Sequence, residues 1–186
     1  SREEWRNVSQ VYPQGKVKMP ANNAITITAK KILARAWGSL TEYVLAYPRR
    51  DGTSVSLTRE VYDHGSAAAI LLLDADRQVM TLVRQFRLPP HLNGDDGNLI
   101  EVCAGLLEGD DPETCAKKEA LEETGIVPSR LQFAFQIYAS PGSLSEKIHC
   151  FVGFYDEGCR RGPGAGWPRR AKRSRLSKPD SISHWR

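Results

Sequence analysis

Three glutamates near the middle of the chain have the residue type and spacing to do chemistry. Glu119, Glu122 and Glu123 stand at positions i, i+3 and i+4, so on an α-helix their carboxylates share one face within a single turn. Like charges at this spacing repel one another, which costs a helix about 0.2–0.5 kcal/mol for each pair. A bound cation would offset that repulsion. Carboxylate oxygens favour a hard divalent ion, Mg²⁺ first and Mn²⁺ second.

The flanking residues favour a metal site over the ordinary alternative, in which a glutamate cluster is a solvent-facing helix surface. Residues 110–112, Asp-Asp-Pro, predict the start of the helix, and Gly125, which can adopt a left-handed conformation, predicts its end. The apolar side is thin and consists chiefly of Ala116, Ala120 and Leu121. We therefore expect the helix to lie close to a sheet, with a charged side more crowded than solubility requires.

A glycine, a loop and this helix form a longer pattern, in which Lys-Glu-x-x-Glu-Glu-x-Gly is followed by an apolar residue. The pattern resembles the signature of the Nudix hydrolases. Asp111 stands where the signature usually has Glu, Lys118 stands where it usually has Arg, and the segment between them is one residue shorter. The matching positions are Gly105, Asp111, Lys118, Glu119, Glu122, Glu123, Gly125 and Ile126.

Stretches outside the signature resemble one branch of that family, the GDP-mannose pyrophosphatases. The resemblance covers residues 24–158 and implies an α/β fold, the Nudix α/β/α sandwich with a mixed sheet, preceded by an N-terminal antiparallel β region. The matching stretches are residues 60–63, 82–87, 93–94, 100–105 and 140–142.

The apolar patterns of the chain agree with such a fold. A first strand is expected at residues 25–29, and residues 40–47 and 53–62 predict two strands joined by a turn that contains Asp-Gly. Residues 67–73 form a continuous apolar run, which is typical of a strand buried on both faces. We divide the chain into a disordered extension (1–22), an N-terminal β region for dimerisation (23–62), a catalytic core (63–158) and a basic, disordered tail (159–186).

The resemblance implies a role for each residue of the metal site. Glu119 and Glu123 are the expected main ligands, the backbone carbonyl of Ala104 completes the coordination sphere, and Glu122 is an auxiliary ligand or helps to hold the site. Ala104 and Gly105 are also expected to contact the substrate. Divalent ions held in this way neutralise the pyrophosphate, orient a water molecule and stabilise the leaving phosphate.

Further residues are candidates for contact with the substrate. Arg87 suits phosphate, whose oxygens match a planar guanidinium, although a surface arginine after a strand would look the same. By resemblance, Arg59 and Glu60 occupy substrate-contacting positions, with an ordinary cross-strand ion pair as the alternative. Glu146 matches an acidic residue beside the scissile pyrophosphate, and a generic loop acid is the alternative.

Trp37 matches an aromatic residue that, in the family dimer, stacks on the base from the partner subunit. Core packing is the alternative explanation. The match carries the expectation of a homodimer. His64 and His149 show no partner in the sequence, and we interpret both as structural residues.

The composition describes one folded domain. With 186 residues, 40% of them apolar, the chain is large enough for a hydrophobic core. No apolar run approaches the roughly 18 residues of a membrane helix, and the polar N-terminus is no secretory signal, so we expect a cytoplasmic protein without membrane contact. The four cysteines have no zinc-site spacing. We interpret them as reduced thiols, with those at 103, 115 and 150 buried.

The basic residues are concentrated at the C-terminus, so the net charge of +4 indicates no specific nucleic-acid partner for the fold. In the branch that the chain resembles, a glycine-rich loop after the last strand is followed by acids, one of which completes the metal site. Here residues 162–166 supply the glycines, but residues 167–173 are Trp-Pro-Arg-Arg-Ala-Lys-Arg. A changed reading frame near Gly166 is one hypothesis, and a native basic tail for nucleic acid is the other.

The predicted function is Mg²⁺-dependent hydrolysis of the pyrophosphate of a nucleotide sugar, with GDP-mannose giving GMP and mannose 1-phosphate. ADP-ribose is the alternative substrate, because similar Nudix folds cleave it. An alternative of another class is an inactive nucleotide-binding remnant, in which loss of the C-terminal acids abolishes turnover.

Overall fold

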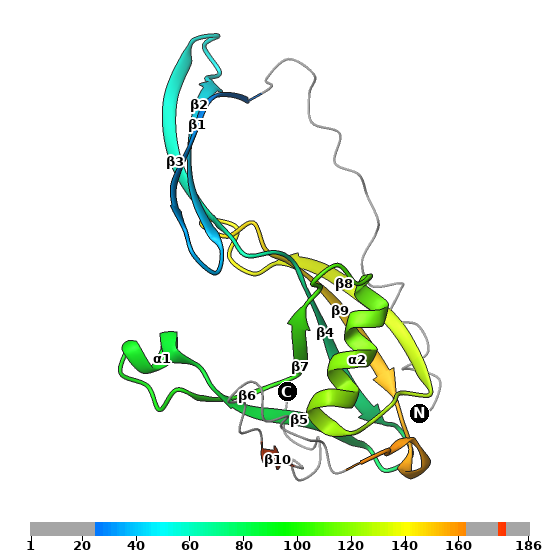
Figure 1. The fold of residues 1–186 in the computed structure, drawn as a ribbon. Helices are drawn as coiled ribbons and strands as arrows, with labels where there is room; N and C mark the ends of the chain where they lie inside the picture. The colour runs from blue at the N-terminus through cyan, green and yellow to red at the C-terminus, as the bar shows by residue number, and fades with distance from the viewer. Residues whose placement is uncertain (1–24, 163–174, 178–186) are drawn as a thin grey trace. The chain divides into compact units, whose positions relative to one another are not determined.

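The computed structural model describes residues 25–162 and the backbone of Arg175–Ser177. The described chain forms two compact units (Figure 1). The first unit contains residues 25–65 and 138–146, and the second contains residues 66–137, 147–162 and the strand at 175–177. The predicted N-terminal extension and residues 163–174 and 178–186 of the predicted tail lie outside the described residues.

The first unit is built on a three-stranded antiparallel sheet in the order β1-β2-β3 (Figure 1). Its strands are β1 (Thr26–Arg35), β2 (Ser39–Pro48) and β3 (Ser54–Asp63). The predicted turn joins β2 to β3, where the Asp51 carboxylate accepts hydrogen bonds from the Thr53 amide at 3.0 Å and the Thr53 hydroxyl at 2.7 Å. Gly52 has a φ of +83°, which explains the preference for glycine. The first strand ends six residues later than the sequence predicts.

The loop at residues 140–146 also belongs to the first unit and is bound to the end of β3. The Tyr62 amide donates to the Ser143 carbonyl at 2.8 Å, and the Ser145 amide donates to the Tyr62 carbonyl at 3.1 Å. A parallel bridge pairs Tyr62 with Leu144. The loop therefore has a defined backbone position beside β3.

The second unit is built on a mixed seven-stranded sheet around β4 (Ala67–Asp74). β9 (Lys147–Phe154) runs parallel to β4, whereas β5 (Val79–Phe86) and β7 (Cys103–Leu106) run antiparallel to it. β8 (Arg130–Tyr138) lies next to β9 at the edge of the sheet. β6 (Asn98–Glu101) and β10 (Arg175–Ser177) both pair with β5. Ala67–Ile70 are all buried, as the continuous apolar run predicts.

Helix α2 (Pro112–Thr124) packs on β7 and β4 and carries the three glutamates. Asp111 caps its start by accepting the Glu113 and Thr114 amides, both at 3.1 Å, and Gly125 ends it with a φ of +72°. The helix bounds are thus as predicted. Leu121 is exposed rather than core-facing, so the small side chains of Cys115, Ala116 and Ala120 make the contact with the sheet.

The α/β fold with a mixed sheet and an N-terminal antiparallel region is confirmed. The remaining described helices are short, α1 (Leu88–Leu92) and the 3₁₀ helix η2 (Glu157–Cys159). A second helical layer is therefore not present among residues 25–162. No helix in this part of the chain has the length and apolar character needed to cross a membrane.

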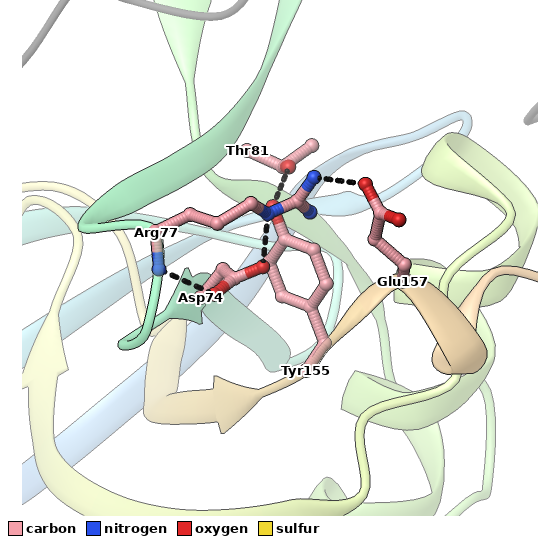
Figure 2. Close-up of polar contacts among 5 residues, drawn as sticks. All are labelled: Asp74, Arg77, Thr81, Tyr155 and Glu157. Atoms are coloured by element: carbon pink, nitrogen blue, oxygen red, sulfur yellow. Dashed lines mark hydrogen bonds and ion pairs between the residues drawn. The ribbon is translucent and has the colours of Figure 1, made fainter.

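A polar cluster joins the turn between β4 and β5 to η2 (Figure 2). Arg77 donates from its Nε to Asp74 at 2.6 Å and from its Nη1 to Glu157 at 2.7 Å, while the hydroxyls of Thr81 and Tyr155 lie 2.7 Å apart. Burial alone would raise the pKa of Asp74, but the hydrogen bonds and charge of Arg77 outweigh it and lower that pKa below its usual value. We call these five residues the Asp74 cluster.

The segment after η2 returns to the end of α2. The Arg161 amide donates to the Gly125 carbonyl at 2.7 Å, and the Arg160 guanidinium donates to the Thr124 carbonyl at 3.3 Å. A cation at this end of a helix is favourable because the helix dipole is negative there. Residues 159–162, which the sequence analysis assigns to the tail, instead continue the fold and hold the C-terminal end of the glutamate helix.

All four cysteines are free thiols, as expected. Cys103, Cys115 and Cys159 are buried, whereas Cys150 is only half-buried. The prediction was therefore wrong for Cys150, and it missed the burial of Cys159, because η2 packs against the core cluster.

Candidate active site

The three glutamates of α2 differ in their surroundings although they share one helical face. Glu123 is 7% exposed, and its Oε1 accepts a hydrogen bond from the Gln85 amide of β5 at 2.9 Å. Glu119 is half-buried and Glu122 is exposed. A charged group is buried only at a cost unless partners stabilise it, so the two more buried carboxylates are the stronger candidates for a specific role.

Gly105 on β7 lies directly beneath Glu119. A Cβ atom added at Gly105 would overlap the Glu119 carboxylate, so only glycine leaves room for the side chain in this position. Ala104, whose carbonyl is the predicted backbone ligand, is the residue before it. Two residues of the sequence signature, Gly105 on β7 and Glu119 on α2, are therefore in close contact.

Two thiols fill the junction between α2 and β7. Burial raises the pKa of Cys103, and the negative charges of Glu123 and Glu119 raise it further. Burial also raises the pKa of Cys115, followed by the charge of Glu119, and the Cys115 Sγ donates to the Leu106 carbonyl at 3.4 Å. Both thiols therefore stay protonated at neutral pH.

The donors at the junction fit a hard divalent ion. Carboxylate oxygens and a nearby main-chain carbonyl are the ligands that Mg²⁺ and Mn²⁺ prefer, and the room that Gly105 leaves brings the Glu119 carboxylate against the strand. Across residues 25–162, no group of three or more His, Cys, Asp or Glu side chains converges on one point. The side chains as they lie thus supply a pair of buried or half-buried carboxylates rather than a closed ligand cage.

Arg87, the predicted phosphate ligand, lies at the end of β5 and is held by a residue that the sequence analysis did not assign to the site. Its Nε donates to Glu101 on β6 at 2.8 Å, with both side chains partly exposed. Such a pair contributes little to stability, but it fixes the direction of the guanidinium. The pairing of β5 with β6 brings the two residues together, and no local spacing reveals it.

Arg59 and Glu60 lie on β3 in the first unit, and both are exposed. Across the sheet Glu60 faces Glu42 and Arg59 faces Tyr43. Like charges directly opposite one another are unfavourable, so this register does not provide the cross-strand ion pair that was the alternative to a substrate role.

Trp37 and Glu146, the other predicted site residues of the first unit, meet at His64. The Trp37 ring stacks on the His64 ring with centroids 4.7 Å apart and planes 15° apart. The His64 Nε2 lies 3.8 Å from the Glu146 Oε2. Trp37 is 68% exposed, which rules out core packing as its explanation. The sequence shows no partner for His64 because its partners lie 27 and 82 positions away.

The predicted site residues therefore fall into two groups, and each unit holds one. The second unit supplies Arg87, Ala104, Gly105, Glu119, Glu122 and Glu123, and the first unit supplies Trp37, Arg59, Glu60 and Glu146. The acidic group at the α2–β7 junction can bind a divalent cation, and an exposed tryptophan can stack on a planar base.

Two family models match the chain, and they meet at residues 62 and 63, close to the boundary between the units at residue 65. The family model described as the NUDIX domain matches residues 63–163. The model described as the GDP-mannose pyrophosphatase NudK N-terminal domain matches residues 24–62. Fold and sequence together define a Nudix pyrophosphatase, and the chain belongs to the Nudix family.

Two GDP-mannose pyrophosphatases are similar to this chain over about three quarters of its length. The GDP-mannose pyrophosphatase of Cronobacter sakazakii is 42% identical over 143 residues, which are 76% of this chain and 75% of the relative. That of Pectobacterium atrosepticum is 42% identical over 146 residues, 78% of this chain and 76% of the relative. A crystal structure of an ADP compounds hydrolase has the same fold, with a TM-score of 0.61, 16% identity and coverage of 83% of this chain and 77% of that chain.

Proposed function

We propose that this chain hydrolyses the pyrophosphate of a nucleotide sugar in an Mg²⁺-dependent reaction, with GDP-mannose giving GMP and mannose 1-phosphate. The observation that supports this substrate is the 42% identity to GDP-mannose pyrophosphatases over about three quarters of both chains. The match of residues 24–62 to the N-terminal domain of the same enzymes adds the segment that carries Trp37 and Arg59.

Glu119 and Glu123 would hold the divalent ion together with the carbonyl of Ala104, and Glu122 would serve as an auxiliary ligand. Mn²⁺ has the same ligand preferences and could replace Mg²⁺. When bound, the metal neutralises pyrophosphate charge and lowers the pKa of a coordinated water. The Gln85 amide holds Glu123 in place, and Gly105 leaves room for Glu119.

The other predicted residues would orient the substrate. Arg87, whose direction Glu101 fixes, would bind phosphate oxygens, since a guanidinium can donate two parallel hydrogen bonds to them. Arg59 and Glu60 would contact the nucleotide, and Trp37 would stack on its base. Glu146 would act beside the scissile pyrophosphate.

A homodimer is part of this proposal. In the first unit, Thr41 is the only buried residue among those described, and β1 exposes Ile27, Ile32 and Leu33. A three-stranded sheet needs an apolar face packed against something else to be stable. A second copy of the chain would cover it. The four free thiols suit a reducing compartment, which supports a cytoplasmic location.

A panel of nucleotide sugars tests the proposal. Purified protein is incubated with Mg²⁺ and either GDP-mannose or ADP-ribose, and the nucleotide and sugar-phosphate products are separated. We expect GMP and mannose 1-phosphate, with GDP-mannose the better substrate by kcat/KM. A preference for ADP-ribose would show that ADP-ribose, and not GDP-mannose, is the substrate. Nucleotide binding without turnover of either compound would indicate an inactive remnant.

A further inference from the structure

His64 lies between two predicted site residues that the sequence keeps 109 positions apart. One face of its ring stacks on Trp37, with centroids 4.7 Å apart, and its Nε2 lies 3.8 Å from the Glu146 carboxylate. The Tyr62 ring contacts the same imidazole at 5.6 Å. All four residues belong to the first unit.

The surroundings of His64 restrict how the ring can act. Its side chain is 11% exposed and that of Glu146 is 14% exposed, so the pair is largely screened from solvent. The Nδ1 atom is buried and has no hydrogen-bond partner among the described residues. A carboxylate near Nε2 favours the tautomer with its proton on that nitrogen. The imidazole therefore directs its N–H towards Glu146.

The backbone on both sides of this contact is fixed. The Tyr62 carbonyl accepts the Ser145 amide at 3.1 Å, and the Asp63 carboxylate accepts the Gly65 amide at 3.0 Å. The first of these bonds ties the Glu146 loop to β3, and the second holds the turn that carries His64. Movement of the ring would consequently change the position of Trp37 or of the Glu146 carboxylate.

We propose that His64 is a positioning residue, which presents the free face of Trp37 to the nucleobase and holds Glu146 for work on the pyrophosphate. This inference rests on the proposed function. Trp37 is 68% exposed, so the ring face opposite His64 is open to a planar base. Because one imidazole contacts both residues, the placement of the Trp37 ring is coupled to the placement of the Glu146 carboxylate.

Two variants separate the two contacts. His64→Phe keeps a flat ring beneath Trp37 and loses the N–H towards Glu146. His64→Gln keeps an N–H donor and loses the ring. Loss of an outer-shell partner at a metal site typically lowers activity by about 10–100-fold. By analogy, His64→Phe should lower kcat on GDP-mannose by about tenfold or more while KM stays within about twofold. His64→Gln should raise KM about fivefold or more, in line with loss of part of a stacking contact, and change kcat less.

His91→Gln is the matched control, because the His91 ring also contacts an aromatic ring, Phe86 at 5.5 Å, but has no role in the proposed site. It should change neither constant. If wild-type protein turns over GDP-mannose and both His64 variants change kcat and KM in the same proportion, the positioning role is wrong while the proposed function stands.

Binding of GDP measured by calorimetry keeps the test independent of turnover. His64→Gln should weaken binding of GDP about fivefold or more, and His64→Phe should leave it nearly unchanged. Equal affinities in wild type and His64→Gln would overturn the stacking role even in a protein that lacks hydrolytic activity.

Discussion

The two units of the chain differ in the size of their buried cores. The second unit has a continuous buried cluster that includes Ile70, Leu72, Val83 and Ile126, and α2 is capped at both ends. The first unit buries one residue, Thr41, among those described. The glutamates that would bind metal thus lie on a well-packed unit. Trp37, in contrast, belongs to a unit whose sheet needs an additional surface to cover it. The comparison predicts that variants in the two units fail in different ways.

The largest expected effect is in the second unit, at Glu123. Glu123→Gln keeps the size of the side chain but removes the charge, so Mg²⁺ affinity should fall at least about tenfold and activity with it. Stability should be kept or slightly improved, because repulsion from Glu119 is relieved. Glu113→Gln, on the exposed first turn of α2 and paired with Lys117, is the control. Mg²⁺ titration that gives the same affinity for Glu123→Gln and wild type would contradict the metal site.

Gly105→Ala tests whether the Glu119 carboxylate lies as close to β7 as the structure shows. The new methyl group would overlap the Glu119 carboxylate, so the carboxylate must turn away and Mg²⁺ affinity should fall about tenfold. At Gly162 a Cβ atom would meet nothing within 4 Å, and Gly162→Ala should behave as wild type. An unchanged Mg²⁺ affinity in Gly105→Ala would show that Glu119 can move without cost.

The sequence predicted local features in both units better than contacts between distant segments. The cap at Asp111, the stop at Gly125 and the turn at Asp51-Gly52 are local, since each depends on residues within a few positions. His64 and Glu101 were missed because their contacts arise only when distant segments meet. The length of β1 was underestimated because every residue from Thr26 to Arg35 is exposed, so alternation between buried and exposed positions does not mark its end.

The Asp74 cluster makes the stability of the second unit depend on pH. The folded-state pKa of Asp74 lies below its ordinary value of 3.8, so its carboxylate stabilises the fold above that pH, and the stabilisation is lost as the pH falls through the lower value. At pH 7, Asp74→Asn should lower the free energy of unfolding by about 1.5–3 kcal/mol, the contribution of hydrogen bonds to a charged group.

Urea unfolding of Asp74→Asn and wild type at a series of pH values measures this difference, which should shrink as the pH falls below 3.8. Asp76→Asn, an exposed change in the same turn, separates the effect of the buried carboxylate from a general effect of charge. A difference of the same size at every pH would show that the ionised form of Asp74 does not carry the effect.

The first unit should respond to substitutions on its surface instead of its interior. Ile27 on β1 is 60% exposed, so Ile27→Lys should barely affect an isolated chain. In a dimer that covers β1, burial of the lysine would remove apolar contact worth about 1.5 kcal/mol or more, and dissociation of the dimer should become about tenfold easier. Nucleotide affinity should then fall, while the Mg²⁺ affinity of the second unit stays unchanged.

Sedimentation at a series of micromolar concentrations measures the dimer, and Ser56→Lys, at an exposed position of β3, is the control for an added charge on the same sheet. A wild-type monomer throughout this range would mean that no second copy covers the sheet. Loss of Mg²⁺ binding in Ile27→Lys would contradict the difference between the two units. The glutamates of α2 would then depend on the first unit as well as on the second.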